Sequence, residues 1–176
     1  MSKQFKSKID VQSESFLKNR AEMLEKIKEM RDLEKRSLNA SESKRKKFEE
    51  RNQLSPRERL NALIDTDSEF IELYNMAGFL VEDNNPETSI PGASVIAGIG
   101  FIQGVRCMIM VDDSGINAGA ATSTTVDKCV GCLEISLEKK LPFVHLVESA
   151  GINLMNYIVE LWAREGGLFA GLAKLS

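Results

Sequence analysis

The stretch Ser94–Asp113, SVIAGIGFIQGVRCMIMVDD, decides the fold of this 176-residue sequence. Two runs of β-branched and other apolar residues flank Gln103 and Gly104, and this pattern predicts two strands joined by a tight turn. Gly104 supplies the positive φ that such a turn needs. Gly98 and Gly100 leave the first strand without side chains at two positions. Because they precede a hairpin and do not open a helix, they are not a dinucleotide-binding fingerprint.

The residues after the hairpin predict a crossover to a further strand. A small-residue loop comes first, then a helix over about residues 122–138, then Pro142 and the strand-like run PFVHLVES (142–149). A strand, a helix and a strand in this order form a parallel, right-handed crossover. Ligands bind such sheets at the loops that follow the carboxyl ends of the strands. Two loops therefore qualify: DDSGINAGAATS (112–123) and ESAGINL (148–154).

Both loops are poor in reactive side chains and rich in exposed main chain. Their small residues leave N–H groups unshielded near helix starts, where the helix dipole favours negative charge. Such groups suit an anion, a phosphate or a developing oxyanion. Close packing of a turn against the sheet explains the same residues equally well, so both interpretations stay open. The small residues are Ala118, Gly119, Ala120, Ala150 and Gly151.

Side-chain catalysis and metal binding have little support in these loops. Neither loop holds a His or Cys, and the one histidine, His145, lies in the middle of a strand whose pattern predicts burial. Nucleophilic catalysis is therefore not expected. Asp112 and Asp113 are neighbours on a strand and point to opposite faces, so we expect no metal site there.

The cysteines are best explained as core residues. Cys129 and Cys132 form a lone CxxC pair, which cannot supply the four ligands that zinc requires. Their spacing with Val126 and Leu133 is that of a buried helix face, and a redox pair is the alternative. Three cysteines, with Cys107 as the third, make a disulfide framework improbable in an intracellular chain.

Two helices are predicted before the hairpin. Apolar residues recur at helical spacing from Phe16 to Leu38 among interleaved Lys and Glu, which predicts an amphipathic helix that docks on a partner surface. Basic residues concentrate in residues 1–60, but no aromatic platform accompanies them, so nucleic-acid binding is not expected. Ser55, Pro56 and Glu58 together predict a capping box and a second helix start.

The composition is that of a chain with one sizeable core. It is 43% hydrophobic with a net charge of −3. No apolar run reaches the roughly 20 residues that a membrane span needs. The start, MSKQFKSKID, lacks the apolar segment of a signal peptide. We therefore expect no membrane association and a cytoplasmic location.

Four motifs occur in register with one known family. They are LSPRERLNALIDTDSEFIEL (54–73), IPGASVIAGIGFIQGVRCMIMVDD (90–113), INAGAATSTTVDK (116–128) and LPFVHLVESAGINL (141–154). In this order they resemble the amino-terminal half of the biotin-dependent acyl-CoA carboxyltransferases. The greatest likeness is to the methylcrotonyl-CoA carboxylase β-subunit group, and it covers most of the chain.

The resemblance implies a fold and a division of the chain. The fold class is α/β, a crotonase-like spiral of ββα units that is truncated here and preceded by the N-terminal amphipathic helix. Residues 1–50 would form a helical extension. Residues 51–176 would form a partial carboxyltransferase N-terminal domain.

The resemblance also implies a mechanism. In the family, the enolate oxygen of an acyl-CoA faces paired main-chain N–H groups, and carboxybiotin on a carrier protein gives its CO2 to the enolate carbon. No covalently bound cofactor or metal is implied. The implied partners are the biotin carboxyl carrier protein, the biotin carboxylase subunit, and a second copy or a complementary carboxyltransferase half. Residue by residue, the oxyanion hole falls on the main chain of Ala150, Gly151 and Ile152, and the acyl-CoA channel on Ala118, Gly119, Ala120 and Asn153.

The sequence departs from the family pattern at defined positions. Ala118 and Ala150 each replace a Gly, which keeps the N–H but disfavours positive φ. The family's Arg-Gly-Lys before the first helix is Arg51, Asn52 and Gln53 here, which removes a cation that could meet a CoA phosphate.

Family subunits carry two crotonase-like halves, and the active site lies between halves of different subunits. This chain ends inside the first half, so we expect it to be inactive alone, as a fragment or a partner-dependent protein. Two alternatives are a non-catalytic or degenerate assembly module of a carboxylase complex and a subunit of a biotin-dependent acyl-CoA decarboxylase.

Overall fold

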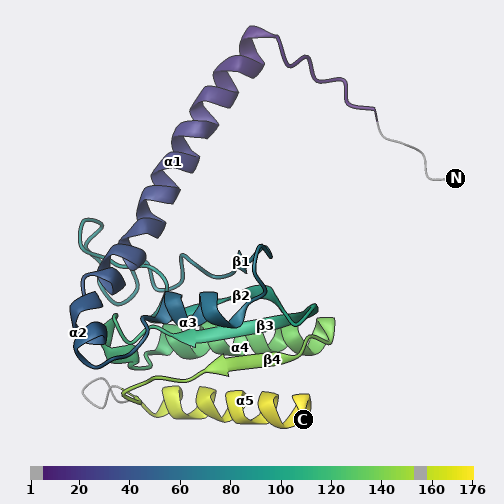
Figure 1. Ribbon diagram of the computed structural model, residues 1–176. Coiled ribbons are helices and arrows are strands. Elements are labelled where there is room, and N and C mark those ends of the chain that lie inside the picture. Colours follow the sequence, from purple (N-terminus) through teal and green to yellow (C-terminus); the bar gives the residue numbers. More distant parts are fainter. Residues whose placement is uncertain (1–5, 153–157) are drawn as a thin grey trace, which may run out of the picture.

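A computed structural model describes residues 6–152 and 158–176, which form a four-stranded mixed sheet with helices on both faces (Figure 1). The strand order is β1-β2-β3-β4; the first three strands are antiparallel and β4 runs parallel to β3. The elements in chain order are α1 (Glu14–Glu42), α2 (Arg45–Glu50), α3 (Pro56–Leu63), β1 (Ile71–Glu72), β2 (Val95–Ile102), β3 (Val105–Asp112), the 3-10 helix η1 (Asn117–Gly119), α4 (Ser123–Lys139), β4 (Phe143–Leu146) and α5 (Val159–Leu175).

The predicted hairpin is confirmed. Strands β2 and β3 pair along their whole length and turn at Gln103 and Gly104. Both turn residues have positive φ, +51° and +75°, which matches the right-handed twist of the two strands. The Asp65 carboxylate, just after α3, accepts the N–H groups of Gln103 and Gly104 at 2.6 and 2.7 Å. The turn is therefore fixed both by its own dihedrals and by a neighbouring acid.

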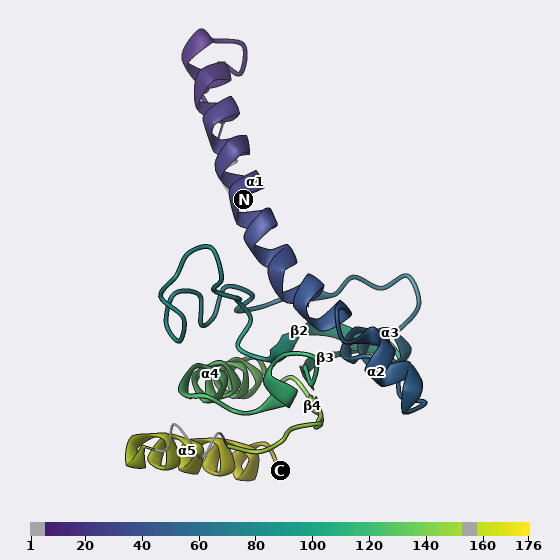
Figure 2. The same ribbon diagram turned by 90° about the vertical axis from the view of Figure 1, so that its left-hand side faces the viewer.

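Strand β3 is buried on both faces, because α4 covers one side of the sheet and α3 the other (Figure 2). Successive side chains point to opposite faces, so the strand contributes to two separate cores. One core joins Met108 and Met110 to the cysteines of α4. The other joins Ile109 and Val111 to Leu60 of α3.

The parallel pairing of the predicted crossover and the core position of its cysteines are confirmed. Helix α4 starts at a Thr122 cap and leads into β4, which pairs in parallel with β3. Cys129 and Cys132 are buried in the core. Desolvation raises the pKa of the Cys129 thiol to about 12 and that of Cys132 to about 11, so both stay protonated and unreactive at neutral pH.

Helix α4 also carries a buried lysine that ties it to the start of β2. The Nζ of Lys128 donates to the main-chain oxygens of Gly92 and Val95. Burial lowers the pKa of Lys128 to about 8. The two carbonyls therefore hold the ammonium where no carboxylate makes an ion pair with it in the described chain.

The second predicted helix start is confirmed at α3. Ser55 Oγ accepts the Glu58 N–H, and the Glu58 carboxylate accepts the Ser55 N–H at 2.8 Å. Pro56 occupies the first helical position, where its missing N–H leaves no hydrogen bond unmade. The capping box fixes the direction of α3, and with it the position of Leu60 over the sheet.

Helix α1 extends well away from the sheet, and its C-terminal part reaches the rest of the molecule (Figure 1). Ser41 Oγ donates to the Asp113 carboxylate, and the Arg36 guanidinium donates to the main-chain oxygens of Pro86 and Ser89. The predicted helix is therefore present; its docking on a partner and the division of the chain at residue 50 stay predictions. Large apolar residues on its outer part are exposed: Leu17, Met23, Leu24, Ile27 and Met30.

None of the helices within residues 6–152 and 158–176 has the length and apolar character that a membrane span needs.

Gly98 approaches β1 so closely that a side chain does not fit. A Cβ at this position would lie 2.4 Å from the Ile71 oxygen and 2.5 Å from Cζ of Phe70. We expect Gly98→Ala to lower the free energy of unfolding by about 1–3 kcal/mol, because β1 and Phe70 must move. Gly166→Ala in α5 is the matched control. Its Cβ would meet nothing within 4 Å, and Ala should gain about 0.5–1 kcal/mol in a helix. Urea unfolding measures both, and a Gly98→Ala chain as stable as the wild type would contradict this packing.

Candidate functional site

The structure brings the two candidate loops together at one edge of the sheet. They follow β3 and β4, and parallel neighbours end at the same edge. The Ala150 N–H donates to the Ala118 oxygen at 3.1 Å, and the Ala121 N–H donates to the Gly151 oxygen at 2.9 Å. The loops are thus joined main chain to main chain in both directions.

Gly119 is the point of closest approach between the loops. Its φ is +69°, and a Cβ there would lie 2.5 Å from the Glu148 oxygen and 3.2 Å from the Ser149 Cα. The Ser149 hydroxyl donates to the Gly119 oxygen at 2.6 Å. A side chain at this position would separate the loops, so the contact requires glycine.

The residues predicted to form an oxyanion hole lie at this junction, with their N–H groups partly engaged. The Gly151 N–H donates to Ser149 Oγ at 3.0 Å, and the Ala150 N–H is bonded to the first loop. Ile152 forms an isolated parallel bridge to the first loop. Asn153, predicted for the acyl-CoA channel, lies outside the described residues.

The two Gly-to-Ala departures differ in conformation. Ala150 has a negative φ, which an alanine adopts without strain, and the neighbouring Gly151 takes the positive value, +85°. Ala118 has φ +54° and ψ +28°, between Asn117 at φ +48° and Gly119 at +69°. The first loop therefore holds three successive left-handed residues, and the alanine among them is strained.

A cavity of about 700 Å³ lies against both loops, and we call it the basic cavity. Lys44, Lys47 and Arg51, in and beside α2, line this cavity. Ala118, Glu148 and Ala150 of the two loops line it as well. Among the described residues these three cationic side chains form no ion pair with any carboxylate. The cavity thus holds these three cations together with residues of both loops.

Sequence reasoning missed Lys44 and Lys47. The signal was the run KRKK at residues 44–47, but interleaved Lys and Glu before it suggested an ordinary solvated helix face. Only the fold shows that α2 lies beside two loops some 70 and 100 residues further along the chain. The lysines of the 44–47 run thus line the same cavity as both loops.

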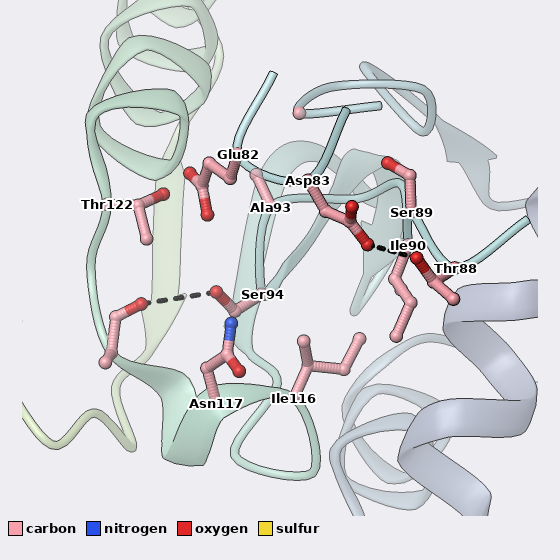
Figure 3. A pocket seen from close by; sticks show the side chains of 12 residues that line it. Glu82, Asp83, Thr88, Ser89, Ile90, Ala93, Ser94, Ile116, Asn117 and Thr122 are labelled. Atoms are coloured by element: carbon pink, nitrogen blue, oxygen red, sulfur yellow. Dashed lines mark hydrogen bonds between the residues drawn. The ribbon is translucent and has the colours of Figure 1, made fainter. Parts of the chain in front are cut away.

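A second cavity, of about 600 Å³, lies on the other side of the first loop (Figure 3). Asn117 lines both cavities, so the segment 117–120 separates them. Glu82 and Asp83 line this second cavity together with several hydroxyl groups, and its lining includes no Lys or Arg. The Ser94 hydroxyl, drawn there, donates to the Ala120 oxygen at 3.2 Å. The two cavities therefore carry charge of opposite sign.

Asp112 and Asp113 point to opposite sides, as predicted. Asp113 Oδ1 accepts the Ser41 hydroxyl at 2.7 Å and the Gly115 N–H at 3.1 Å, and burial raises the pKa of this carboxyl. Asp112 Oδ1 lies 2.8 Å from Nε2 of His145. The predicted burial of His145 is wrong: its side chain is 25% exposed, because the last strand, β4, is only partly covered.

Known proteins are similar to this chain in sequence and in fold. Residues 47–176 match the family described as the carboxyl transferase domain. A probable biotin-dependent acyl-CoA carboxylase β2 subunit of Mycobacterium tuberculosis is 36% identical over 72% of this chain and 22% of its own length. The methylcrotonoyl-CoA carboxylase β chain of Dictyostelium discoideum is 35% identical over 83% of this chain and 24% of its own. The chain thus spans about a quarter of the length of these relatives.

A solved structure agrees with these matches. The β subunit of Pseudomonas aeruginosa geranyl-CoA carboxylase superposes with a TM-score of 0.88 and 39% identity, over 98% of this chain and 32% of that subunit. The likeness confirms the predicted α/β class and its agreement with carboxyl transferase structures.

Relieving the strain at Ala118 should stabilise the chain. We expect Ala118→Gly to raise the free energy of unfolding by about 0.5–1 kcal/mol, because the left-handed penalty exceeds the entropy that glycine loses. Ala120→Gly is the control in the same loop. Its φ is −63°, so glycine there should lower stability by about as much. Chemical unfolding of both variants gives the two signs, and stabilisation by neither or by both would contradict the assigned dihedrals.

Proposed function

The chain belongs to the carboxyl transferase domain family, and we propose that it is the acyl-CoA-binding amino-terminal part of a biotin-dependent carboxyltransferase. The reaction would transfer CO2 from carboxybiotin to the enolate carbon of an acyl-CoA. Because the chain spans about a quarter of its relatives, a complete site would also use a second crotonase-like half.

The basic cavity is the observation that carries this proposal. An acyl-CoA has phosphates at one end and a thioester at the other, joined by a flexible, uncharged arm. Lys44, Lys47 and Arg51 suit the phosphates, since charge-assisted hydrogen bonds to anions are the strong ones. The main-chain N–H groups of the loop residues that line the same cavity suit the thioester. Both ends of the ligand therefore find partners of matching chemistry in one cavity.

The thioester oxygen would take the place of the Ala118 oxygen on the Ala150 N–H. As the enolate forms, negative charge develops on that oxygen, and an N–H already aimed at it stabilises the charge. Rotation of the Ser149 side chain about its Cα–Cβ bond would move Oγ away and release the Gly151 N–H as a second donor. One such donor is typically worth about 2.7–4 kcal/mol of barrier. The loops would thus contribute to catalysis without a reactive side chain.

The remaining components would come from outside the residues that the structure describes. Biotin would arrive on a biotin carboxyl carrier protein after loading by a biotin carboxylase subunit. A second copy or a complementary carboxyltransferase half would close the site. The names of the Mycobacterium and Dictyostelium relatives support a place in such a carboxylase.

A second candidate function is that of a non-catalytic assembly module. One observation favours it: the Ala150 and Gly151 N–H groups already bond within the chain. Such a module would keep the family's packing surface, and the thioester of an acyl-CoA would add no affinity. It predicts equal affinity for CoA and for acyl-CoA, whereas the carboxyltransferase role predicts tighter binding of the acyl-CoA.

Charge reversal in the basic cavity tests the proposed function. We expect Lys44→Glu with Lys47→Glu to weaken acyl-CoA binding about tenfold or more, because the phosphates lose two cations and meet two anions. Wild-type binding should also weaken as salt is raised. Isothermal calorimetry with this chain, at low and high salt, measures both effects.

Two controls accompany that experiment. Lys46→Glu makes one charge reversal of the same kind in α2, at an exposed position that does not line the cavity, so it should leave affinity nearly unchanged. An acyl-pantetheine, which lacks the nucleotide phosphates, should bind the double variant as it binds the wild type. If the wild-type chain binds no acyl-CoA, or if Lys46→Glu weakens binding as much as the double variant, the proposal fails.

A further inference from the structure

Asp112, the last residue of β3, is only 5% exposed, yet it takes no part in the acyl-CoA contacts proposed above. Its carboxylate contacts both β4 and the turn that follows β4. Oδ1 lies 2.8 Å from Nε2 of His145 within β4, and Oδ2 accepts the Glu148 N–H at 2.9 Å. One buried side chain therefore binds both the strand and the turn that follows it.

This carboxylate acts where the main-chain ladder stops. The pairing of β3 with β4 ends at Val111 and Leu146, so within the described residues the β3–β4 ladder does not reach the turn. Asp112 is the next residue along β3, and its side chain supplies the acceptor that the ladder no longer offers to the Glu148 N–H. This hydrogen bond extends the attachment of the β4 segment to β3 by two residues, from Leu146 to Glu148 at the edge of the candidate site.

A second set of contacts fixes the side chain of Glu148 to the same residue. Arg59 of α3 donates from Nη2 to the Asp112 main-chain oxygen at 2.9 Å and pairs through Nη1 with the Glu148 carboxylate at 3.0 Å. The Ser114 hydroxyl donates to the other Glu148 oxygen at 2.9 Å. Asp112, Arg59 and Glu148 thus close a ring of hydrogen bonds that joins both strands to α3.

Glu148, which these contacts hold in place, lies next to the N–H groups proposed to bind the thioester. Gly119 packs against the main-chain oxygen of Glu148. The Ala150 N–H lies two residues further along the same turn. We propose that Asp112 is a positioning residue: its carboxylate holds the turn 148–151 against the first loop and so places the Ala150 and Gly151 N–H groups for the acyl-CoA thioester. This inference rests on the proposed function.

The test combines amide exchange with a comparison of two ligands. In Asp112→Ala, amide hydrogen exchange at Glu148 and Ala150 should accelerate about tenfold or more, the effect of losing one buried hydrogen bond. Affinity for CoA should stay the same, because its phosphates bind elsewhere in the cavity. The preference for acyl-CoA over CoA should disappear. Asp112→Asn keeps an oxygen for the Glu148 N–H and should restore both the protection and the preference.

Asp113→Ala is the matched control, since Asp113 is the adjacent buried acid and bonds Ser41 and the Gly115 N–H on the other side. It should leave the Glu148 and Ala150 amides protected. A general loss of structure would affect both variants alike, whereas a positioning role affects only Asp112→Ala.

The outcomes separate this inference from the proposed function. If wild type prefers acyl-CoA and Asp112→Ala keeps both the preference and the amide protection, the positioning role is wrong and the proposed function stands. If wild type binds no acyl-CoA while exchange at Glu148 still depends on Asp112, the proposed function fails, and with it the ligand part of the inference. Should Asp112→Ala not fold, wild-type exchange decides: a Glu148 amide that exchanges at the unprotected rate overturns the inference.

Discussion

The parallel pairing of β3 with β4 is the constraint on which the site depends. Helix α4 connects the two strands, so both end at the same edge and release their loops side by side. The loops can then meet only as closely as their residues allow. Gly119 permits main-chain contact with Glu148, and two hydrogen bonds between loop main chains follow from that contact. Without the crossover, the small residues of each loop would have no partner.

The site combines main-chain groups of the two loops with charged side chains from elements that are distant in sequence. The loops offer N–H groups and short side chains, whereas the cations come from α2 and the structural carboxylates from the strand end and the turn. Segment 117–120 separates a basic cavity from an acidic one. An anionic ligand is therefore attracted to one side of the loop only. This division would give a long phosphate-bearing substrate a defined direction across the sheet edge.

Much of the fold could be predicted because it rests on local signals. The hairpin follows from Gln103 and Gly104, the helix starts from capping residues, and the burial of Cys129 and Cys132 from helical spacing. The site was less predictable because its parts are distant in sequence. Lys44 and Lys47 meet the loops through tertiary packing alone, and the left-handed Ala118 contradicts the local preference of alanine. His145 is only partly buried because β4 is an edge strand, which the strand's own pattern does not reveal.

Titration of the isotope-labelled chain with an acyl-CoA, followed by amide chemical shifts, tests the central claim most directly. If the joined loops and α2 form the acyl-CoA site, the largest shift changes should occur at the amides of residues 118–120 and 150–151 and along residues 44–51. Residues that line only the acidic cavity, such as Glu82 and Asp83, should change little. Changes centred on the acidic cavity, or no change at either loop at saturating ligand, would contradict the account.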